Sequence, residues 1–155
     1  MPLLRAELSW NFVLATAICA SLLAQLIKVL LNLFIFHRFI AERMWGAGGM
    51  PSSHSATVCA MVVATGRYCG VNSPIFAIAA VLSIIVMYDA MGVRYETGEQ
   101  AKVLNRMFTE WMDQGFEQFQ LPHGKKLKEM VGHTPIEVVT GAALGIVLGF
   151  AMPMV

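Results

Sequence analysis

The sequence is poor in charge. Asp, Glu, Lys and Arg make up 14% of its 155 positions, whereas 57% are hydrophobic; an ordinary soluble domain is about 25% charged. The formal net charge is +1 and the basic residues form no long block, which leaves no electrostatic case for nucleic acid as a partner. The bilayer is therefore the expected solvent, and we predict a multi-pass integral membrane protein.

Cysteines and clustered carboxylates are scarce as well. The three cysteines, Cys19, Cys59 and Cys69, lie in or beside apolar segments without metal-ligand or disulfide-framework spacing, which predicts buried thiols. Asp89 and Glu137 are the only acids near the apolar segments, so the sequence offers no carboxylate cluster for a metal ion. We expect no metal and no other cofactor.

Four apolar segments predict an all-α fold, a membrane helix bundle forming one domain over residues 1–155. They cover about residues 8–36, 53–65, 73–91 and 134–155. A hydrocarbon core is roughly 30 Å thick, which a helix of about 20 residues crosses. The second segment is short and ends at Gly66 and Arg67, so it is either a tilted crossing or a partly embedded helix.

The polar segment 92–132 predicts one further helix, an amphipathic one. Apolar residues recur in it at helical spacing while charged residues take the opposite side. Such a helix either lies on the membrane surface or packs on the bundle as a soluble cap. Its apolar positions are Ala101, Leu104, Phe108, Trp111 and Met112.

The predicted loops at one end of the bundle carry most of the positive charge. Segments 37–52 and 92–132 hold eight of the eleven Lys and Arg residues. The positive-inside rule therefore makes both loops cytoplasmic and both termini external, provided that the second segment crosses the membrane. The eight residues are Arg38, Arg43, Arg94, Lys102, Arg106, Lys125, Lys126 and Lys128.

Polar residues from four segments are expected to meet at this same face. Lys28 lies in the latter half of the first segment, His54 begins the second, Asp89 ends the third and His133 precedes the fourth. A catalytic site needs residues from several elements brought together, which unrelated polar positions would not provide.

Lys28 also belongs to a polar stripe of the first segment. Gln25, Lys28 and Asn32 are spaced i, i+3 and i+7, so a helix places them on one side, which must face protein or water. The alternative is a lysine that snorkels from near the helix end.

The segment 48–56 predicts a glycine-rich turn that leads into a helix, with Ser52 as the candidate N-cap. Free N–H groups and the helix dipole favour an anion there, which makes Gly49, Ser52 and Ser53 candidates for phosphate binding. His54, in the first turn, could donate a proton to the leaving oxygen of a phosphate ester. The alternative is a helix cap with an incidental histidine.

The second histidine segment starts the last helix. Thr134 and Glu137 form a capping box with Pro135 at the first helical position, which gives Glu137 a structural role. Glu137 also stands four residues after His133, so it can accept one imidazole N–H and leave the other nitrogen free to attack phosphorus. The two roles are compatible.

These motifs resemble those of the type 2 phosphatidic acid phosphatases, relatives of bacterial acid phosphatases and vanadium haloperoxidases. Residues 51–54 are similar to the Pro-Ser-Gly-His signature of that family, and His133, Glu137 and Gly141 to its last signature. The runs 48–56 and 89–94 are similar to its divergent, short subfamily, so the resemblance covers nearly the whole chain. It implies a transiently phosphorylated His133 and a general acid at His54.

The sequence departs from the family pattern at the phosphate-binding positions. Ile35 stands where an arginine is expected seven residues after Lys28, Leu127 stands where another is expected before His133, and Ser53 replaces a glycine. The phosphate charge must then be held by another set. We predict Lys28 and Arg94, with Asp89 orienting one of them.

Three functions are open at this point. The first is a metal-independent phosphatase for a lipid phosphate or an isoprenoid phosphate or pyrophosphate, with a phosphohistidine intermediate. The second is an inactive membrane scaffold or regulatory protein that keeps the fold, which the missing arginines favour. The third is a small transporter, in which Lys28 and Asp89 would be pathway charges.

The last apolar segment carries a ladder of small residues. Gly141, Gly145 and Gly149 recur every four residues, which permits close helix contact either within the bundle or between two subunits of a homodimer.

Overall fold

The computed structural model describes residues 11–36, 49–114, 126–129 and 131–154, and these are helical with no strand among them. The all-α prediction is therefore confirmed, and so is the helix predicted inside the polar segment. The helices are α2 (Phe12–Phe36), α4 (Ser53–Cys69), α5 (Pro74–Met91), α6 (Val93–Asp113) and α7 (Pro135–Ala151).

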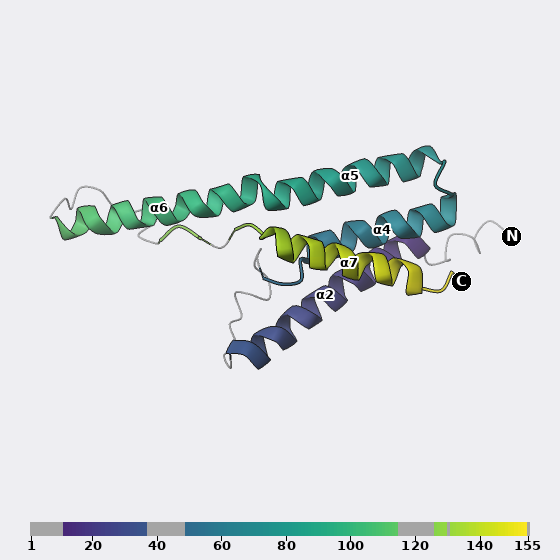
Figure 1. The fold of residues 1–155 in the computed structure, drawn as a ribbon, viewed down its shortest axis with the longest axis horizontal. Coiled ribbons are helices and arrows are strands. Elements are labelled where there is room, and N and C mark those ends of the chain that lie inside the picture. The colour runs from purple at the N-terminus through teal and green to yellow at the C-terminus, as the bar shows by residue number, and fades with distance from the viewer. Residues whose placement is uncertain (1–10, 37–48, 115–125, 130, 155) are drawn as a thin grey trace, which may run out of the picture.

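Helices α2, α4, α5 and α7 form the bundle and alternate in direction (Figure 1). The start of α2 and the end of α7 lie at one end, beside the turn that joins α4 to α5. The starts of α4 and α7 and the end of α5 lie at the other end. This alternation brings the two predicted histidine segments to the same end of the molecule.

Helix α4 is the centre of the bundle. Both α4 and α7 contact the other three helices, but the contacts of α4 with α2 and α5 are more extensive than those of α7, and α2 and α5 make no contact with each other among the described residues. By length and composition, α2 and the continuous stretch Pro74–Asp113 pass as membrane spans, and α7 is a shorter apolar helix. Since α4 is surrounded by protein, it does not need the apolar surface that lipid demands. Its buried alanines instead pack in a core cluster with Ala20 and Ala24 of α2.

The glycine ladder of α7 packs against α4. A Cβ at Gly141 would collide with the backbone oxygen of Ser52, and a Cβ at Gly145 with that of Ala56. At Gly149 it would come within 2.6 Å of Val63 Cβ. The ladder therefore serves contact within the bundle, which leaves it unavailable for contact between subunits.

Helix α4 is longer than predicted. Gly66 does not end it; this glycine makes room for Phe76 of α5, whose Cε2 would lie 3.0 Å from an added Cβ. The helix continues to Cys69 and stops at Gly70, whose φ of 83° suits glycine and whose N–H donates to the Gly66 oxygen. The prediction placed the helix end at the wrong glycine, because packing against α5 is invisible in a local pattern.

Arg67 lies in the last turn of α4 and closes the far end of the bundle. Its Nη1 donates to the backbone oxygens of Gly149 at 2.6 Å and Met152 at 2.7 Å, and its guanidinium lies 5.5 Å from the centre of the Phe12 ring. These hydrogen bonds satisfy backbone carbonyls at the end of α7 that have no partner within the helix. Helix α7 ends at Ala151, four residues before the end of the predicted segment 134–155.

Helix α6 continues in the direction of α5, beyond the other helices, and does not fold back over the bundle as a cap (Figure 1). Its buried residues are Gly98, Ala101 and Asn105. The Asn105 amide pins the segment 126–129, since it donates to the Leu127 oxygen at 2.9 Å and accepts from the Leu127 N–H at 2.8 Å. The predicted apolar face is covered only in part, because Ala101 is buried while Leu104 is 44% exposed and Met112 is 62% exposed.

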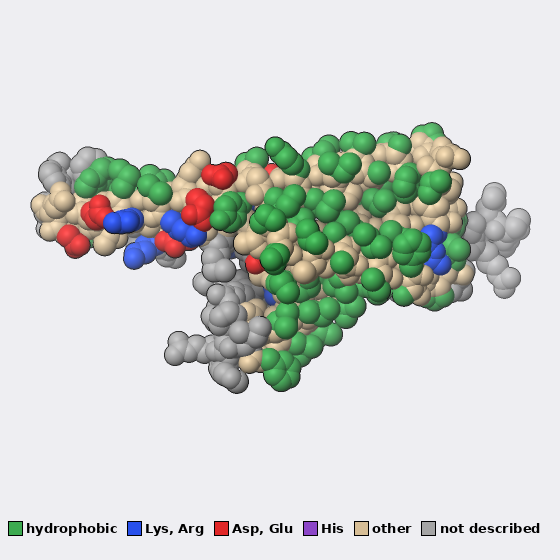
Figure 2. Space-filling view, in the orientation of Figure 1, with side chains coloured by type: hydrophobic (Ala, Val, Ile, Leu, Met, Phe, Trp, Pro, Cys, Tyr) green, Lys and Arg blue, Asp and Glu red, His purple; other side chains and the backbone are tan. Residues whose placement is uncertain are grey.

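The surface of the bundle is largely hydrophobic, whereas most of the charged side chains in this view lie over α6 (Figure 2). Large apolar side chains such as Leu22, Ile78 and Phe150 are each more than half exposed, as expected of helices that face lipid. Cys19 and Cys69 are exposed on this surface and only Cys59 is buried, so the prediction of three buried thiols was wrong for two of them.

Candidate active site

The two histidine segments are fixed to the bundle through backbone hydrogen bonds. The N–H of His133 donates to the oxygen of Ala90 at 3.0 Å, which ties the approach to α7 to the end of α5. The N–H of Ser52 donates to the oxygen of Glu137 at 2.9 Å, which ties the start of α4 to the first turn of α7. Three helix ends are thereby held in one frame.

This frame brings His54 and His133 together. Their ring centres lie 5.9 Å apart with the planes at 64°. His133 is only 2% exposed, whereas His54 is exposed. Two side chains 79 positions apart in the sequence are thus close enough to contact one small group from two sides.

Glu137 holds His133 from behind. Its Oε2 lies 3.1 Å from His133 Nδ1 and also accepts the N–H of Thr134 at 3.1 Å, and the N–H of Gly49 is directed at the same carboxylate. An ionised carboxylate can only accept, so Nδ1 carries the hydrogen, and in the neutral form of the ring Nε2 is the nitrogen with the lone pair. The capping box and the contact with His133 coexist, as the spacing allowed.

His133 Nε2 is buried and has no hydrogen-bond partner in the described structure. A buried imidazole nitrogen normally finds a partner, so an unpaired one calls for an explanation. Its ring lines an open pocket of about 270 Å³, and a ligand there would supply the missing partner. The other lining residues are His54, Ile85, Val86, Asp89, Ala90 and Arg94.

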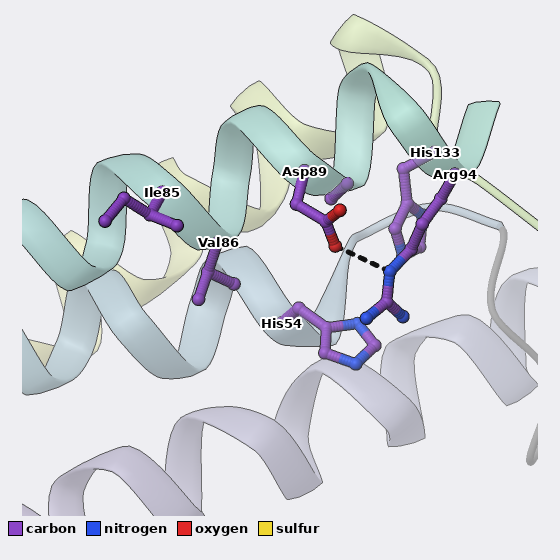
Figure 3. A pocket seen from close by; sticks show the side chains of 7 residues that line it. His54, Ile85, Val86, Asp89, Arg94 and His133 are labelled. Atoms are coloured by element: carbon purple, nitrogen blue, oxygen red, sulfur yellow. Dashed lines mark hydrogen bonds and ion pairs between the residues drawn. The ribbon is translucent and has the colours of Figure 1, made fainter. Parts of the chain in front are cut away.

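Arg94 and Asp89 form an ion pair over this pocket, with Nε 2.7 Å from Oδ2 (Figure 3). The pair spans the joint at Gly92 between α5 and α6. Asp89 engages Nε, and no described residue is hydrogen-bonded to the two terminal nitrogens of the guanidinium, which can therefore bind an anion. Figure 3 shows this group extending across the pocket toward the His54 ring.

Lys28 lies near this pocket without lining it. Its side chain is 2% exposed and its stem packs on Gly49, where an added Cβ would lie 3.5 Å from Lys28 Cδ. Its charge acts on both His54 and Glu137. The polar stripe of the first helix thus faces protein as predicted, and Gln25 of the same stripe donates to Ser53 Oγ at 3.5 Å.

Ser52 and Ser53 do not line the pocket, and the hydroxyl of each has a protein partner. Ser52 is the N-cap of α4, and its Oγ accepts from the Ser55 N–H at 3.3 Å and from Ser55 Oγ at 3.1 Å. Ser53 Oγ faces α2 through Gln25. The structure therefore brings His54, Asp89, Arg94 and His133 into one pocket and places both serines in its supporting frame.

In the described part of the chain, three helices begin at this end of the molecule, namely α4, α6 and α7. Each helix start carries free N–H groups and the positive end of a dipole, which favours an anion. The start of α6 at Gly92 has no side-chain cap. With the guanidinium and two imidazoles nearby, this end of the bundle is suited to bind a phosphate.

The sequence pattern missed the apolar wall of the pocket. Ile85 and Val86 stand four and three residues before Asp89, so helical spacing places all three on one side of α5. This spacing was the available signal. It was hidden because apolar residues occupy nearly every position of α5.

A second cavity, of about 130 Å³, lies on the other side of the histidine and glutamate pair. Glu137 lines it and His133 does not, whereas the reverse holds for the first pocket. The hydrogen bond between the two side chains therefore joins two separate spaces. The remaining lining residues are Gly49, Tyr95, Glu99, Lys102, Glu129, Val131, Gly132 and Thr134.

Comparison with known proteins agrees with this architecture. Residues 9–148 match the sequence profile of the Divergent PAP2 family. The chain belongs to this family. It is also 38% identical, over 148 residues, to an uncharacterized membrane protein, YuiD, of Bacillus subtilis strain 168, with 92% of this chain and 94% of the relative covered. No solved structure matches the chain.

Membership of the divergent PAP2 family supports the relation to phosphatases of that type and the placement in a membrane. The match includes the His54 turn, the joint between α5 and α6, and the first three turns of α7. The four polar side chains of the pocket in this divergent PAP2 member, those of His54, Asp89, Arg94 and His133, therefore all lie within the region that matches the family.

Proposed function

We propose that this protein is a histidine-dependent phosphatase that hydrolyses a membrane-embedded phosphate ester without a metal ion. The observation that carries the proposal is the buried, unpaired Nε2 of His133, a residue that lines the same pocket as His54, while Glu137 holds the other ring nitrogen. This is the arrangement that an activated nitrogen nucleophile requires.

In the first step, His133 Nε2 attacks phosphorus and a P–N bond forms. The bond from phosphorus to the ester oxygen breaks, and this oxygen takes a proton from a protonated His54. Glu137 keeps its hydrogen bond to Nδ1–H and balances the positive charge that develops on the ring. The products of this step are an alcohol and a phosphohistidine.

In the second step, a water molecule attacks the phosphorus. His54, now neutral, accepts a proton from this water, and the P–N bond breaks with its electron pair returning to His133 Nε2. Inorganic phosphate leaves, and both histidines regain their starting protonation states. The sum of the two steps is hydrolysis of one ester bond.

Arg94, oriented by Asp89, binds the equatorial oxygens of the phosphate in this proposal. The charge of Lys28 and the N–H groups at the helix starts assist from behind the pocket. Arg94, Lys28 and these N–H groups would together replace the arginines expected from the family pattern. The 2.7 Å ion pair between Arg94 and Asp89 supports the part of Arg94, because it holds the guanidinium at the pocket.

The substrate we propose is a lipid phosphate or an isoprenoid phosphate or pyrophosphate, and the chain crosses the membrane several times. The positive-inside pattern supports a cytoplasmic position for the site. The pocket supports an amphiphile, because charged residues and the apolar pair Ile85 and Val86 line the same space. A head group at the membrane boundary would reach His133 while its tail stays in lipid.

Trapping of phosphate on His133 tests the proposal. The purified chain is incubated with a long-chain phosphate ester labelled on phosphorus, quenched in base and mapped by mass spectrometry. We expect an acid-labile phosphate on the peptide with His133, and none in the His133→Asn variant. A protein that binds phosphate yet never forms this adduct and releases no phosphate would be the inactive scaffold that the missing arginines favour.

A further inference from the structure

The pocket is polar at one end and apolar at the other. His54, Asp89, Arg94 and His133 form the polar end. The remaining lining residues, Ile85, Val86 and Ala90, offer no side-chain hydrogen-bond donor or acceptor. A ligand that fills the whole pocket therefore meets charge first and hydrocarbon directly after it.

The apolar end extends along α5 toward the middle of the bundle. Helix α5 runs toward the site and ends at Met91, so residues before Asp89 lie farther from the polar end of the bundle, which under the proposed topology is deeper in the membrane. Ile85 lies one helical turn below Asp89, about 6 Å along the axis at 1.5 Å per residue. Figure 3 shows Ile85 and Val86 on the far side of Asp89 from Arg94. Ile85 is 58% exposed, which leaves this end of the pocket open to lipid.

The same side of α5 continues as an apolar track. Positions four, seven to eight and eleven before Asp89 lie on one side of a helix. They are Ile85, then Val81 and Leu82, then Ile78, and all four are at least 45% exposed. A chain that leaves the pocket past Ile85 can thus remain in contact with hydrocarbon side chains.

We propose that the substrate is a phosphate monoester of one apolar chain, hydrocarbon from its first carbon onward, and that Ile85 and Val86 determine this specificity. The inference rests on the proposed function and narrows it: long-chain alkyl and isoprenoid phosphates fit, whereas phosphates of acylated glycerol do not.

Glycerol esters fail for a physical reason. Their carbonyl groups follow the phosphate within a few bonds, so they would lie against Ile85 and Val86. A carbonyl moved from water to an apolar surface without a hydrogen bond is costly, roughly a factor of ten or more in affinity. An alkyl or isoprenoid chain has no such group there, and its first carbons gain from the same contact.

Three amphiphiles distinguish the effect of polar groups next to the phosphate from the effect of the number of hydrocarbon chains. Hexadecyl phosphate has one chain and no polar group after the phosphate, oleoyl lysophosphatidate has one chain with a glycerol ester, and dioleoyl phosphatidate has two. Each is presented at the same surface fraction in mixed micelles. Phosphate release gives kcat/KM for the intact protein, and equilibrium binding to the His133→Asn variant gives a second reading that needs no turnover.

We expect hexadecyl phosphate to exceed both glycerol phosphates by roughly tenfold in kcat/KM and in binding. Val86→Thr keeps the shape of the side chain and adds a hydroxyl that can donate to a carbonyl. It should therefore reduce the preference for hexadecyl phosphate over the glycerol phosphates several-fold. The matched control is Val147→Thr, at a 65% exposed position on α7 outside the pocket lining. It should leave the preference for hexadecyl phosphate unchanged.

The outcomes are separable. Equal binding and hydrolysis of all three amphiphiles would overturn the inference while the phosphohistidine proposal stands. Equal kcat/KM and binding for lysophosphatidate and hexadecyl phosphate would also overturn it. The specificity would then depend on the number of chains and not on the polar groups that follow the phosphate. Loss of all turnover and of the histidine adduct would instead remove the proposed function, and the binding data would still report the specificity.

Discussion

His133 Nδ1 lies 3.1 Å from Glu137 Oε2, while Nε2 of the same ring is buried without a partner at the pocket that His54 also lines. One ring thus has a fixed hydrogen on one side and a free lone pair on the other. The first turn of α7 creates this state, since the carboxylate that caps the helix is also the group that orients the ring.

Replacement of Glu137 by Gln should separate these two roles. The amide can still accept the Thr134 N–H, so the melting temperature should change little, but it cannot balance charge on His133. We expect kcat to fall by roughly 100-fold or more. Phosphate release and thermal unfolding are measured on the same preparation. Unchanged kcat in Glu137→Gln would reduce the carboxylate to a helix cap.

Arg94 and Asp89 should affect substrate binding unequally. Arg94→Ala removes the guanidinium, and we expect KM for a phosphate ester to rise by roughly 10-fold to 100-fold. Asp89→Asn leaves the guanidinium in place but loosens its orientation, so it should have a smaller effect in the same direction. Arg94→Lys should resemble the alanine variant more than the wild type, because an ammonium cannot bind Asp89 and phosphate in the same planar geometry.

Arg106→Ala is the control for that series. Its side chain is 82% exposed, pairs with Glu110 on α6 and lies outside the pocket. Its substitution should leave KM unchanged. An equal rise in KM for Arg106→Ala and Arg94→Ala would show that the effect comes from general charge and not from the pocket.

Gly145→Ala should destabilise the bundle strongly. The added Cβ would meet the backbone oxygen of Ala56, which cannot rotate away as a side chain would. Overpacking costs typically about 1–3 kcal/mol, and a backbone contact belongs at the upper end of that range. Ala143→Val adds bulk at an exposed position of the same helix and should be tolerated. Denaturation in detergent micelles compares the two, and equal stabilities would contradict the close contact of α4 and α7.

Arg67 should matter for stability and not for chemistry. Arg67→Ala loses two charge-assisted hydrogen bonds to Gly149 and Met152, and we expect a loss of about 1–3 kcal/mol in unfolding free energy. Arg67→Lys should recover part of it. Since the site lies at the opposite end of the bundle, kcat of the folded fraction should stay unchanged. A selective loss of kcat without loss of stability would place Arg67 in the mechanism.

The convergence of the histidines could be predicted because it depends on helix number and direction. Alternating spans bring the starts of the second and fourth to one end, so His54 and His133 had to share a face. The capping box at Thr134 and Glu137 was equally local, since its spacing alone defines it. These features survive in the structure because tertiary packing does not compete with them.

Other features depended on neighbours that a local pattern does not contain. The local pattern predicted Ser52 correctly as the N-cap of α4, but it could not show that Ser53 Oγ accepts from Gln25 of α2. The direction of α6 follows from the joint at Gly92, which periodicity does not determine. Its amphipathic pattern predicted a helix correctly and left open whether it lies on the membrane surface or caps the bundle. It could not predict the hydrogen bonds by which Asn105 holds the segment 126–129.

The separation of the two cavities has a consequence for catalysis in a membrane. A substrate tail that fills the first pocket, lined by His133, leaves the second cavity open. Glu137, Tyr95, Lys102 and Glu129 line this second cavity. Water in it would keep the Glu137 carboxylate solvated while the reacting phosphorus is shielded. The hydrogen bond between His133 and Glu137 then links a side chain in the space that the substrate closes to one in a space that stays open to water. An enzyme built this way can exclude solvent from its substrate while the carboxylate that orients its nucleophile stays hydrated.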